Sequence, residues 1–228
     1  MGNTLYIVAT PIGNLKDITL RALEVLRTAD VVLCEDTRVT RKLLSHYEIS
    51  ARVESFHAHS TDGKVRKILN LLETNTAIAL VTDAGTPGIS DPGSELVARV
   101  RRELPDVAIV PIPGPSALST ILSAAGIESS EFVFLGFLPH KKGRETLFRE
   151  IAAASRAMIF YESPHRILKA LASLAGVLGP ERTVVIGREL TKMHEEIVSG
   201  SAQDLLAHYE RHPDRVRGEF VVIVDSPQ

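Results

Sequence analysis

Short apolar runs alternate along this sequence with segments in which apolar residues recur at helical spacing. Val65, Ile68, Leu69 and Leu72 illustrate the helical segments, because they follow the i, i+3, i+4, i+7 pattern of an amphipathic helix. The apolar runs have the length of buried strands and occupy residues 5–9, 31–34, 77–81, 107–110, 132–135, 157–161, 183–187 and 220–224. Strands separated by helices predict an α/β fold in which most strands are parallel.

A proline-rich segment interrupts this alternation near the middle of the chain. It reads Pro111-Ile112-Pro113-Gly114-Pro115-Ser116 and directly follows the strand predicted over 107–110. Proline stiffens the backbone and cannot continue a helix, so the segment is typical of a hinge between domains. We therefore predict two α/β domains, residues 1–112 and 113–228, with a ligand-binding cleft between them.

Composition and charge restrict the classes of function. The chain has 26 Lys and Arg against 28 Asp and Glu, a formal net charge of -2, so any nucleic-acid binding must use local patches. No apolar run is long enough to span a membrane, and the amino terminus lacks the basic and apolar pattern of a leader. We expect a cytoplasmic protein with no membrane partner. The single Cys34 has apolar neighbours, which predicts a buried, inert thiol.

Several common enzyme motifs are missing from the sequence. It contains neither Gly-x-Gly-x-x-Gly nor Gly-x-x-x-x-Gly-Lys-Ser/Thr, which argues against a standard dinucleotide site and a P-loop. The His-Glu-x-x-His motif of metalloproteases and the Gly-x-Ser-x-Gly motif of serine hydrolases do not occur either. His57 and His59 could bind a metal, but an isolated pair in a polar loop is usually solvated, and we predict no metal site.

Glycine-rich loops follow several of the predicted strands. The longest starts at Asp83, after the strand predicted over 77–81, and reads Asp-Ala-Gly-Thr-Pro-Gly-Ile-Ser-Asp-Pro-Gly. Open α/β sheets bind ligands at the carboxyl ends of their strands, where glycine lets a small molecule approach the backbone. Shorter loops of this kind occupy residues 10–14 and 113–119. A plain strand-to-helix turn is the alternative, but three such loops favour a neutral or zwitterionic ligand bound largely by backbone groups.

Several motifs follow one another in a fixed order and cover nearly the whole chain. They are Thr-Pro-Ile-Gly-Asn-Leu at 10–15, Asp-Ile-Thr at 17–19, Glu-Asp-Thr-Arg at 35–38, Asp-Ala-Gly-Thr-Pro at 83–87, Pro-Gly-Pro-Ser at 113–116, Phe-Tyr-Glu-Ser-Pro-His-Arg at 160–166 and Gly-Glu-Phe at 218–220. Together they resemble the tetrapyrrole methylase superfamily. More closely, they resemble its ribosomal RNA branch, whose members methylate the ribose 2′-oxygen of a cytidine in the decoding region of small-subunit ribosomal RNA.

The resemblance implies a fold, a cofactor and a set of binding residues. We expect two α/β domains of tetrapyrrole methylase type, the first with a mostly parallel sheet and the second with a mixed one. We also expect a homodimer, with S-adenosylmethionine bound in the cleft between the domains. The residues that would line the cofactor are Ile12, Asp83, Thr86, Pro87, Ile89, Ser116, Ala117, Tyr161, Arg188, Glu219 and Phe220.

Polar clusters outside these loops are the candidates for catalysis and RNA binding. The candidate proton acceptors are Asp36, Glu162, His165 and Glu189. Arg38 or Lys192 could stabilise the alkoxide that forms as the proton leaves. Each of these residues could equally have a structural role, as a helix cap or in an ion pair. The residues predicted to contact the RNA are Asn14, Arg41, Lys42, Lys141, Lys142, Arg144 and Arg166, although a basic segment is as often a solvated surface loop.

Three alternatives remain open. A methylase of uroporphyrinogen or a precorrin would have the same fold and cofactor but a polyanionic macrocycle as its substrate. A catalytically reduced paralogue would bind the ribosome without turnover. A hydrolase or reductase is disfavoured because its motifs are missing. Members of the RNA branch commonly continue into a helical extension after the last strand, whereas this sequence ends at Gln228.

Overall fold

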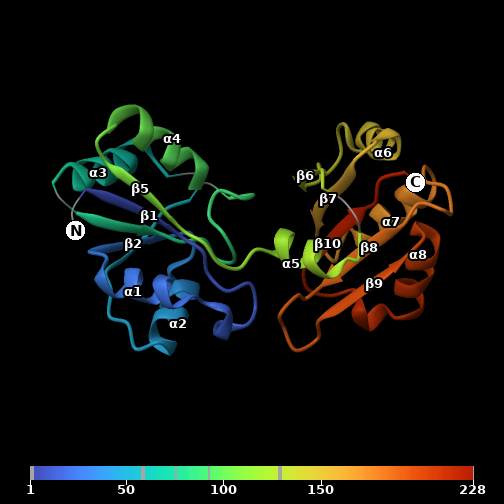
Figure 1. Cartoon of the computed structure of the whole chain (residues 1–228), viewed down its shortest axis with the longest axis horizontal. Helices are drawn as coiled ribbons and strands as arrows, with labels where there is room; N and C mark the ends of the chain where they lie inside the picture. The colour runs from blue at the N-terminus through green and yellow to red at the C-terminus, as the bar shows by residue number, and fades with distance from the viewer. Residues whose placement is uncertain (1–2, 58–59, 75, 92, 128–129, 228) are drawn as a thin grey trace. The chain divides into compact units, whose positions relative to one another are not determined.

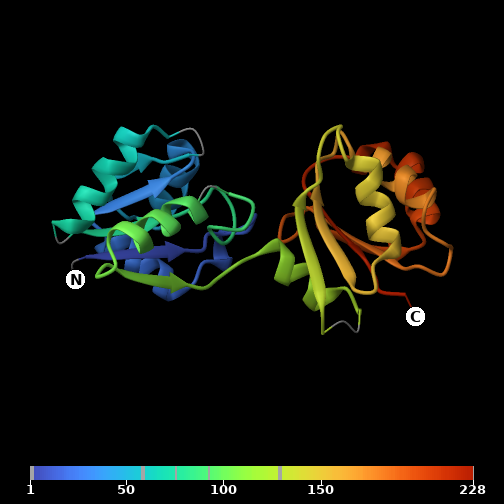
Figure 2. The same cartoon turned by 90° about the horizontal axis from the view of Figure 1, so that it is seen from above.

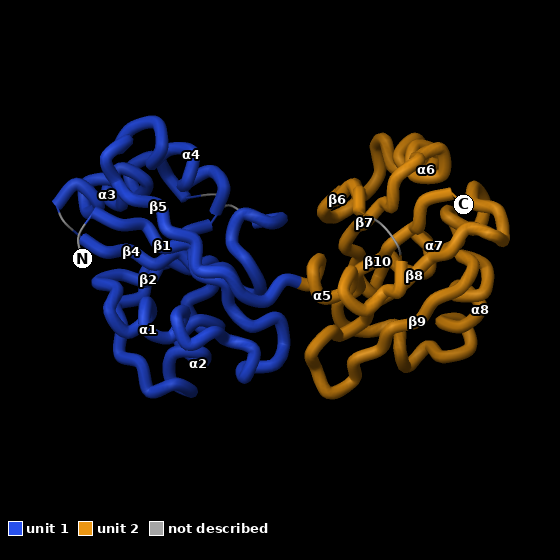
Figure 3. Tube along the Cα trace, in the orientation of Figure 1, with its two compact units in different colours: residues 1–116 blue, residues 117–228 orange. Residues whose placement is uncertain are grey.

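The computed structural model describes residues 3–57, 60–74, 76–91, 93–127 and 130–227. The chain divides into two compact units, residues 1–116 and 117–228, called unit 1 and unit 2 below (Figure 3). We had expected the second domain to begin at residue 113, but the compact units divide after Ser116, so the whole proline-rich segment belongs to unit 1.

Unit 1 is built on a parallel sheet of five strands in the order β3-β2-β4-β1-β5 (Figure 1). The strands are β1 (Thr4–Val8), β2 (Val31–Cys34), β3 (Val53–Ser55), β4 (Ala77–Leu80) and β5 (Ala108–Ile112). The helices between them are α1 (Leu20–Thr28), α2 (Thr37–His46), α3 (Asp62–Glu73) and α4 (Gly93–Glu103), with a short 3-10 turn η1 (Leu15–Asp17).

The helices of unit 1 cover both faces of its sheet, and each face has its own core. On one face α1 and α2 pack with Leu26 and Leu44, and on the other α3 and α4 pack with Leu69 and Leu96 (Figure 1). The stripe predicted over 65–72 is confirmed, since all four of its apolar residues are buried in α3. Cys34 is buried as expected, and burial raises the pKa of its thiol.

Unit 2 has a mixed sheet of five strands in the order β6-β7-β10-β8-β9. The elements are α5 (Ala117–Ala124), β6 (Phe132–Phe137), α6 (Arg144–Ala153), β7 (Ala157–Glu162), α7 (Ile167–Ala175), β8 (Val184–Arg188), β9 (Glu196–Gly200), α8 (Ala202–Arg211), η2 (Pro213–Arg215) and β10 (Phe220–Val224). β6 is parallel to β7, and β10 is antiparallel to both of its neighbours. All five residues of β10 are buried, because it lies at the centre of the sheet.

The two faces of the unit 2 sheet are covered differently. α6, α7 and α8 pack on one face around a core that includes Phe160, Leu171 and Tyr209 (Figure 2). On the other face α5 approaches β8 so closely that a Cβ at Gly187 would lie 2.7 Å from the Ile121 side chain. α5 therefore covers the centre of this face, and the edge strands β6 and β9 are covered less.

The structure contains two strands that the sequence pattern did not reveal. β3 is only three residues long and includes the charged Glu54, and β9 alternates between half-buried and exposed positions. Such strands have no continuous apolar run, because one side of an edge strand faces solvent. The alternation of strands and helices also favoured parallel pairing, whereas β6 with β7 is the one parallel pair among the described strands of unit 2.

Candidate functional site

The loops after β1 and β4 meet at the carboxyl edge of the unit 1 sheet. The amide of Thr10 donates to the carbonyl of Gly85 at 2.9 Å, and the amide of Gly85 donates back at 3.1 Å. The buried Thr10 hydroxyl donates to the carbonyl of Thr82 at 3.1 Å. β1 and β4 are neighbours, but the chain leaves β1 toward β2 and leaves β4 toward β5. Open α/β sheets bind their ligands at such a switch point.

The loop after β5 joins the first two loops at Gly85 and Thr86. The hydroxyl of Thr86 donates to the carbonyl of Pro115 at 3.1 Å. Gly85 has a φ of +86°, and a Cβ at this position would lie 3.3 Å from Cγ2 of Ile12. A side chain there would be strained and would displace Ile12. The three glycine-bearing loops predicted to bind a ligand therefore converge on one place in unit 1.

Two aspartates hold the backbone of this region through main-chain amides. Oδ1 of Asp83 accepts from the amide of Asp36 at 2.9 Å, which ties the loop after β4 to the loop after β2. The carboxylate of Asp91 accepts from the amides of Gly88 and Gly93 at 2.7 to 2.9 Å. Hydrogen bonds to a carboxylate are stronger than those between neutral groups. The loop conformation is thus fixed within unit 1, with Asp83 still exposed to solvent.

Asp36 and Arg38 form a local ion pair at the start of α2. Asp36 caps the helix by accepting from the amide of Arg38 at 2.8 Å, and its carboxylate pairs with the Arg38 guanidinium at 2.6 Å. These bonds from Arg38 lower the pKa of Asp36 to about 2. A general base works best when its pKa is near the working pH, so Asp36 is a weak proton acceptor at neutral pH.

In unit 2, Glu162 lies at the end of β7 between two arginines. Its side chain is fully buried, and it accepts from Arg144 at 2.8 Å and from Arg166 at 2.7 Å. The amide of Ser163 adds a third hydrogen bond at 2.8 Å. A carboxylate is stable in the interior only when it is paired and hydrogen-bonded in this way. The structure therefore joins three predicted site residues in one ion-pair cluster, with both Glu162 oxygens occupied.

Glu189 and Lys192 form a second cluster after β8. Nζ of Lys192 donates to Glu189 at 2.7 Å and to Glu219 at 3.0 Å, and the amide of Glu219 also donates to Glu189 at 3.0 Å. Burial opposes the charge on Lys192, but the two carboxylates outweigh it and raise the pKa of Lys192. Burial likewise opposes the charge on Glu189, but the Lys192 ammonium lowers the pKa of Glu189. Both groups are therefore charged at neutral pH.

Arg188 belongs to a third cluster, which is centred on Glu196 of β9. Nε of Arg188 donates to Glu196 at 3.1 Å, and one of its terminal nitrogens donates to the carbonyl of His194 at 2.9 Å. Glu196 also pairs with Arg215 and accepts from the hydroxyl of Tyr209 at 3.4 Å. Burial and the charge of Glu196 raise the pKa of Tyr209, so its hydroxyl stays protonated. The Arg188 side chain is thus engaged within unit 2.

Comparison with known proteins assigns the family. The model of the family described as Tetrapyrrole (Corrin/Porphyrin) Methylases matches residues 4–206. The chain belongs to this family. Solved structures titled cobalt precorrin-4 methyltransferase and uroporphyrin-III-C-methyltransferase from Thermus thermophilus align with TM-scores of 0.66 at 20% and 19% identity. These alignments cover 97% and 98% of this chain and 94% of each solved chain, and they show two α/β domains of tetrapyrrole methylase type.

Other relatives are more similar to this chain than these solved structures are, and they are named for a different substrate. Proteins from Vibrio cholerae and Escherichia coli O157:H7 named ribosomal RNA small subunit methyltransferase I are each 49% identical to this chain. The alignments cover 96% and 97% of the chain and 76% and 77% of the relatives. A relative with this name from Synechocystis is 44% identical over 96% of the chain and 78% of its own length.

In this tetrapyrrole methylase, the predicted cofactor residues are divided between the two units. Unit 1 contains Ile12, Asp83, Thr86, Pro87, Ile89 and Ser116, and unit 2 contains Ala117, Tyr161, Arg188, Glu219 and Phe220. In unit 2, Phe220 is paired with Glu162 on one side and with Arg188 on the other. The first residue of β10 therefore brings the ends of β7 and β8 together.

The predicted RNA contacts of this methylase fall into two groups. Side chains of the first group are exposed cations, which are Arg41, Lys42, Lys141 and Lys142. Arg144 and Arg166 form the second group, because both are engaged with Glu162. Asn14 belongs to neither, since its side chain caps η1 by accepting from the amide of Lys16 at 3.1 Å.

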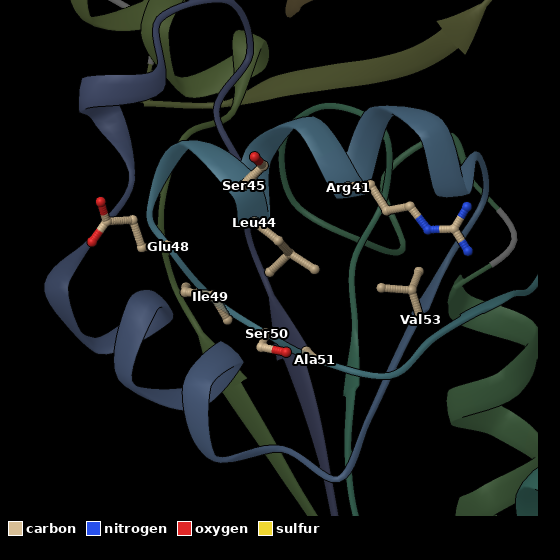
Figure 4. A pocket seen from close by; sticks show the side chains of 8 residues that line it. All are labelled: Arg41, Leu44, Ser45, Glu48, Ile49, Ser50, Ala51 and Val53. Atoms are coloured by element: carbon tan, nitrogen blue, oxygen red, sulfur yellow. The ribbon is translucent and has the colours of Figure 1, made fainter.

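A hollow beside the end of α2 contains one of these residues (Figure 4). Its volume is about 420 Å³, and it is lined by Arg41, Leu44, Ser45, Glu48, Ile49, Ser50, Ala51 and Val53. Arg41 is the one predicted site residue among them. The hollow is therefore separate from the loops that converge on Gly85.

The two histidines that could pair at a metal site are His57 and His59. His59 lies outside the described ranges, so the pairing of His57 with His59 is not described. Among the residues that the structure does describe, no three His, Cys, Asp or Glu side chains are grouped as metal ligands would be. No helix in the described part of the chain is long and apolar enough to cross a membrane.

Sequence reasoning missed Glu196, which pairs with Arg188, and Arg215, which pairs with Glu196. Glu196 starts β9, and the alternation from Glu196 to Gly200 was the one signal that could have revealed this strand. Arg215 lies in η2, far along the chain from β8, and no local pattern indicates that it pairs with Glu196.

Proposed function

We propose that this chain methylates the ribose 2′-oxygen of a cytidine in the decoding region of small-subunit ribosomal RNA, with S-adenosylmethionine as the methyl donor. The observation that carries the proposal is 49% identity, over 96% of the chain, to a relative named ribosomal RNA small subunit methyltransferase I. The convergence of three loops at Gly85 supports a small-molecule site in the same protein.

The chemistry of the unit 1 loops fits this donor. S-adenosylmethionine has a positive sulfonium, a zwitterionic amino-acid group and an adenine. It therefore needs carboxylates or carbonyls near its positive groups, and hydrogen-bond donors, acceptors and apolar contacts for the rest. Asp83 supplies an exposed carboxylate, Ile12 and Ile89 are apolar, and the backbone at Gly85 has no side chain. We propose that Thr86, Pro87, Ser116, Ala117, Tyr161, Glu219 and Phe220 complete the site. Arg188 would shape it indirectly, because its side chain is engaged with Glu196.

The reaction depends mainly on alignment. The ribose oxygen forms a bond to the methyl carbon, the carbon–sulfur bond breaks, and the hydroxyl proton passes to a base or to water. The donor supplies a methyl group that is already activated by the positive sulfur. The protein must therefore place the ribose in line with the methyl group and assist the loss of one proton.

We rank the four candidate bases by the groups that surround them. Asp36 is a weak base because Arg38 holds its pKa at about 2, and both oxygens of Glu162 accept hydrogen bonds. Despite burial, Lys192 lowers the pKa of Glu189, which makes Glu189 a weaker proton acceptor as well. His165 is exposed just after β7, and histidine is the side chain best suited to proton transfer near neutral pH. We therefore place His165 first, with Lys192 or Arg38 as the cation beside the developing alkoxide.

A transfer assay tests this proposal directly. Purified protein is incubated with labelled S-adenosylmethionine and small ribosomal subunits that lack the modification, and the product is mapped by mass spectrometry of RNA fragments. We expect label on the 2′-oxygen of one cytidine. Label on uroporphyrinogen or a precorrin would support the tetrapyrrole alternative, and binding of the subunit without transfer would support the catalytically reduced paralogue.

We also propose where the protein acts and how it assembles. We propose that it acts in the cytoplasm on the ribosomal subunit and that it forms a homodimer, as the family resemblance implies. Light scattering of the purified protein tests the dimer, and a mass near 24.8 kDa, that of a single chain, would contradict it.

A further inference from the structure

β6 ends in an exposed phenylalanine. It lies on the face of the unit 2 sheet opposite α6, α7 and α8. Phe137 is 56% exposed. The rings of Phe134 and Phe137 lie 5.0 and 5.4 Å from the ring of Tyr161, both in edge-to-face geometry. Such packing is favourable and fixes the orientation of a ring. Tyr161 therefore holds Phe137 in a defined position, while more than half of the Phe137 side chain faces solvent.

A bulge in β6 places Phe137 on this face. Phe134 pairs with Ile159 and Phe137 pairs with Tyr161, so three steps along β6 match two steps along β7. Gly136, with a φ of +63°, lies within this irregularity. Side chains alternate along a strand, so without the extra residue Phe137 would lie on the face covered by α6, α7 and α8. Bulges often redirect a side chain for function.

Exposed cations follow this ring along the chain. Lys141 and Lys142 are exposed in the loop between β6 and α6, next to the exposed His140. Four residues of chain span at most about 14 Å, so the backbone of Lys141 lies within that distance of Phe137. Proteins bind single-stranded nucleic acid by combining aromatic rings, on which bases stack, with cations that contact phosphates.

The Glu162 cluster fixes the start of this loop. A terminal nitrogen of Arg166 donates to the carbonyl of Leu138 at 3.0 Å, and one of Arg144 donates to the carbonyl of Pro139 at 3.1 Å. The other terminal nitrogens of the same arginines bind the two oxygens of Glu162. One buried carboxylate thus holds two arginines, and the arginines hold the backbone between Phe137 and the lysines.

We propose that Phe137, Lys141 and Lys142 form a contact surface of unit 2 for single-stranded RNA, held in position by Glu162. Phe137 stacks on an unpaired base, and the two lysines contact flanking phosphates. Glu162 is a positioning residue, which acts through Arg144 and Arg166. This inference rests on the proposed function, because it names the surface that recognises the RNA substrate.

A second copy of this chain is the other occupant to consider. The cores of protein interfaces are depleted in lysine, whereas a phosphate backbone needs positive charge. Phe132 provides a direct comparison, because it is 41% exposed at the opposite end of β6, about 16 Å away along the strand. An apolar interface along this edge would use both phenylalanines, whereas stacking beside the lysines would use Phe137.

The first test compares these two phenylalanines. Affinity for unmodified small ribosomal subunits is measured for Phe137→Ala, Phe137→Trp and the control Phe132→Ala. Loss of one stacked base predicts a weakening of about 5- to 150-fold for Phe137→Ala, with recovery in Phe137→Trp and no change in Phe132→Ala. Equal loss in both alanine variants, together with a change from dimer to monomer, would assign the surface to a second copy and overturn the proposal.

The second test examines the lysines and Glu162. Replacing both lysines by alanine should reduce the slope of log affinity against log salt by about 1.4, because each removes one phosphate contact. Glu162→Gln should weaken RNA binding in the parent protein but by less than twofold when both lysines are already alanine. Replacing the two lysines should leave the affinity for S-adenosylmethionine unchanged. If Glu162→Gln does not fold, Arg144→Lys replaces it, since this change keeps the charge but loses the bond to Pro139.

The outcomes separate this inference from the proposed function. If the parent protein does not methylate small subunits, the proposed function fails. If the parent protein is active but Phe137→Ala binds subunits as tightly as the parent, the stacking role is wrong. If the effects of Glu162→Gln and of the lysine changes multiply independently, Glu162 does not act through this loop.

Discussion

Unit 1 and unit 2 hold the loops at their sheet edges by different interactions. In unit 1, the loops are joined mainly by neutral and main-chain hydrogen bonds, such as those between Thr10 and Gly85 and between Thr86 and Pro115. In unit 2, buried or partly buried carboxylates at Glu162, Glu189 and Glu196 each pair with basic side chains. The comparison shows that a charged residue at the end of a strand need not be available for catalysis.

We propose that this difference gives the two edges different tasks. The unit 1 loops would offer backbone groups and the Asp83 carboxylate to a small, zwitterionic ligand. In unit 2, the carboxylates are neutralised by their basic partners, and the exposed cations beside them would be available to a polyanion. The following predictions can break or sharpen this comparison.

The largest effect is expected for Glu162→Ala. Removing the carboxylate leaves Arg144 and Arg166 partly buried without a counter-charge, which should reduce the free energy of unfolding by about 3–5 kcal/mol. The matched control is Glu131→Ala, which breaks an exposed ion pair with Arg156 and should change the free energy of unfolding far less. Urea denaturation followed by circular dichroism measures both. Similar losses in the two variants would show that the Glu162 cluster is not a structural centre.

Asp83→Ala should have the next largest effect. It removes the acceptor for the amide of Asp36 and a carboxylate near the proposed donor site, so affinity for S-adenosylmethionine should fall by about 1.5–3 kcal/mol. Arg38→Ala is the control, because its side chain is 84% exposed and pairs only with Asp36 in the described structure. Calorimetric titration measures both affinities, and an equal loss in the two variants would contradict the role of Asp83.

Gly85→Ala and Gly126→Ala separate backbone strain from ligand binding. Both glycines have positive φ, so either change should cost about 1–2 kcal/mol of stability. A Cβ at Gly85 would approach Ile12, whereas among the described residues, the two chain neighbours of Gly126 aside, none has an atom within 4 Å of a Cβ at Gly126. Only Gly85→Ala should therefore weaken binding of S-adenosylmethionine. Unchanged binding in this variant would show that the convergence of the loops is not a ligand site.

The smallest effect is a pH dependence at Glu189. Its pKa lies below the ordinary value in the folded protein, so its pairing with Lys192 stabilises the fold above about pH 4.5 and is lost as pH falls. Glu189→Gln should therefore lower stability by roughly 1 kcal/mol or less at pH 7, because the pair is partly exposed. The difference between the two proteins should shrink below pH 4.5. A difference that grows in acid would reverse the sign of this linkage.

The sequence predicted the elements and loops of unit 1 better than the charge pairs of unit 2. The loops at 10–14, 83–89 and 113–116 could be placed because each follows an apolar strand, and parallel strands end at the same sheet edge. The partners of Glu162 could not be predicted, because Arg144 is 18 residues away and reaches it only after β7 and α6 have packed. The position of Phe137 depends on a bulge, which shifts every later side chain in the strand to the other face.

The central position of β10 has a consequence for how the protein is made. Residues 220–224 pair with β7 on one side and β8 on the other, so neither strand has its full set of neighbours until this late segment emerges from the ribosome. Unit 1, whose strands all precede residue 113, can assemble while the rest is still being translated. A nascent chain stalled before Phe220 would expose two unpaired strand edges, which makes it a target for aggregation or for chaperones.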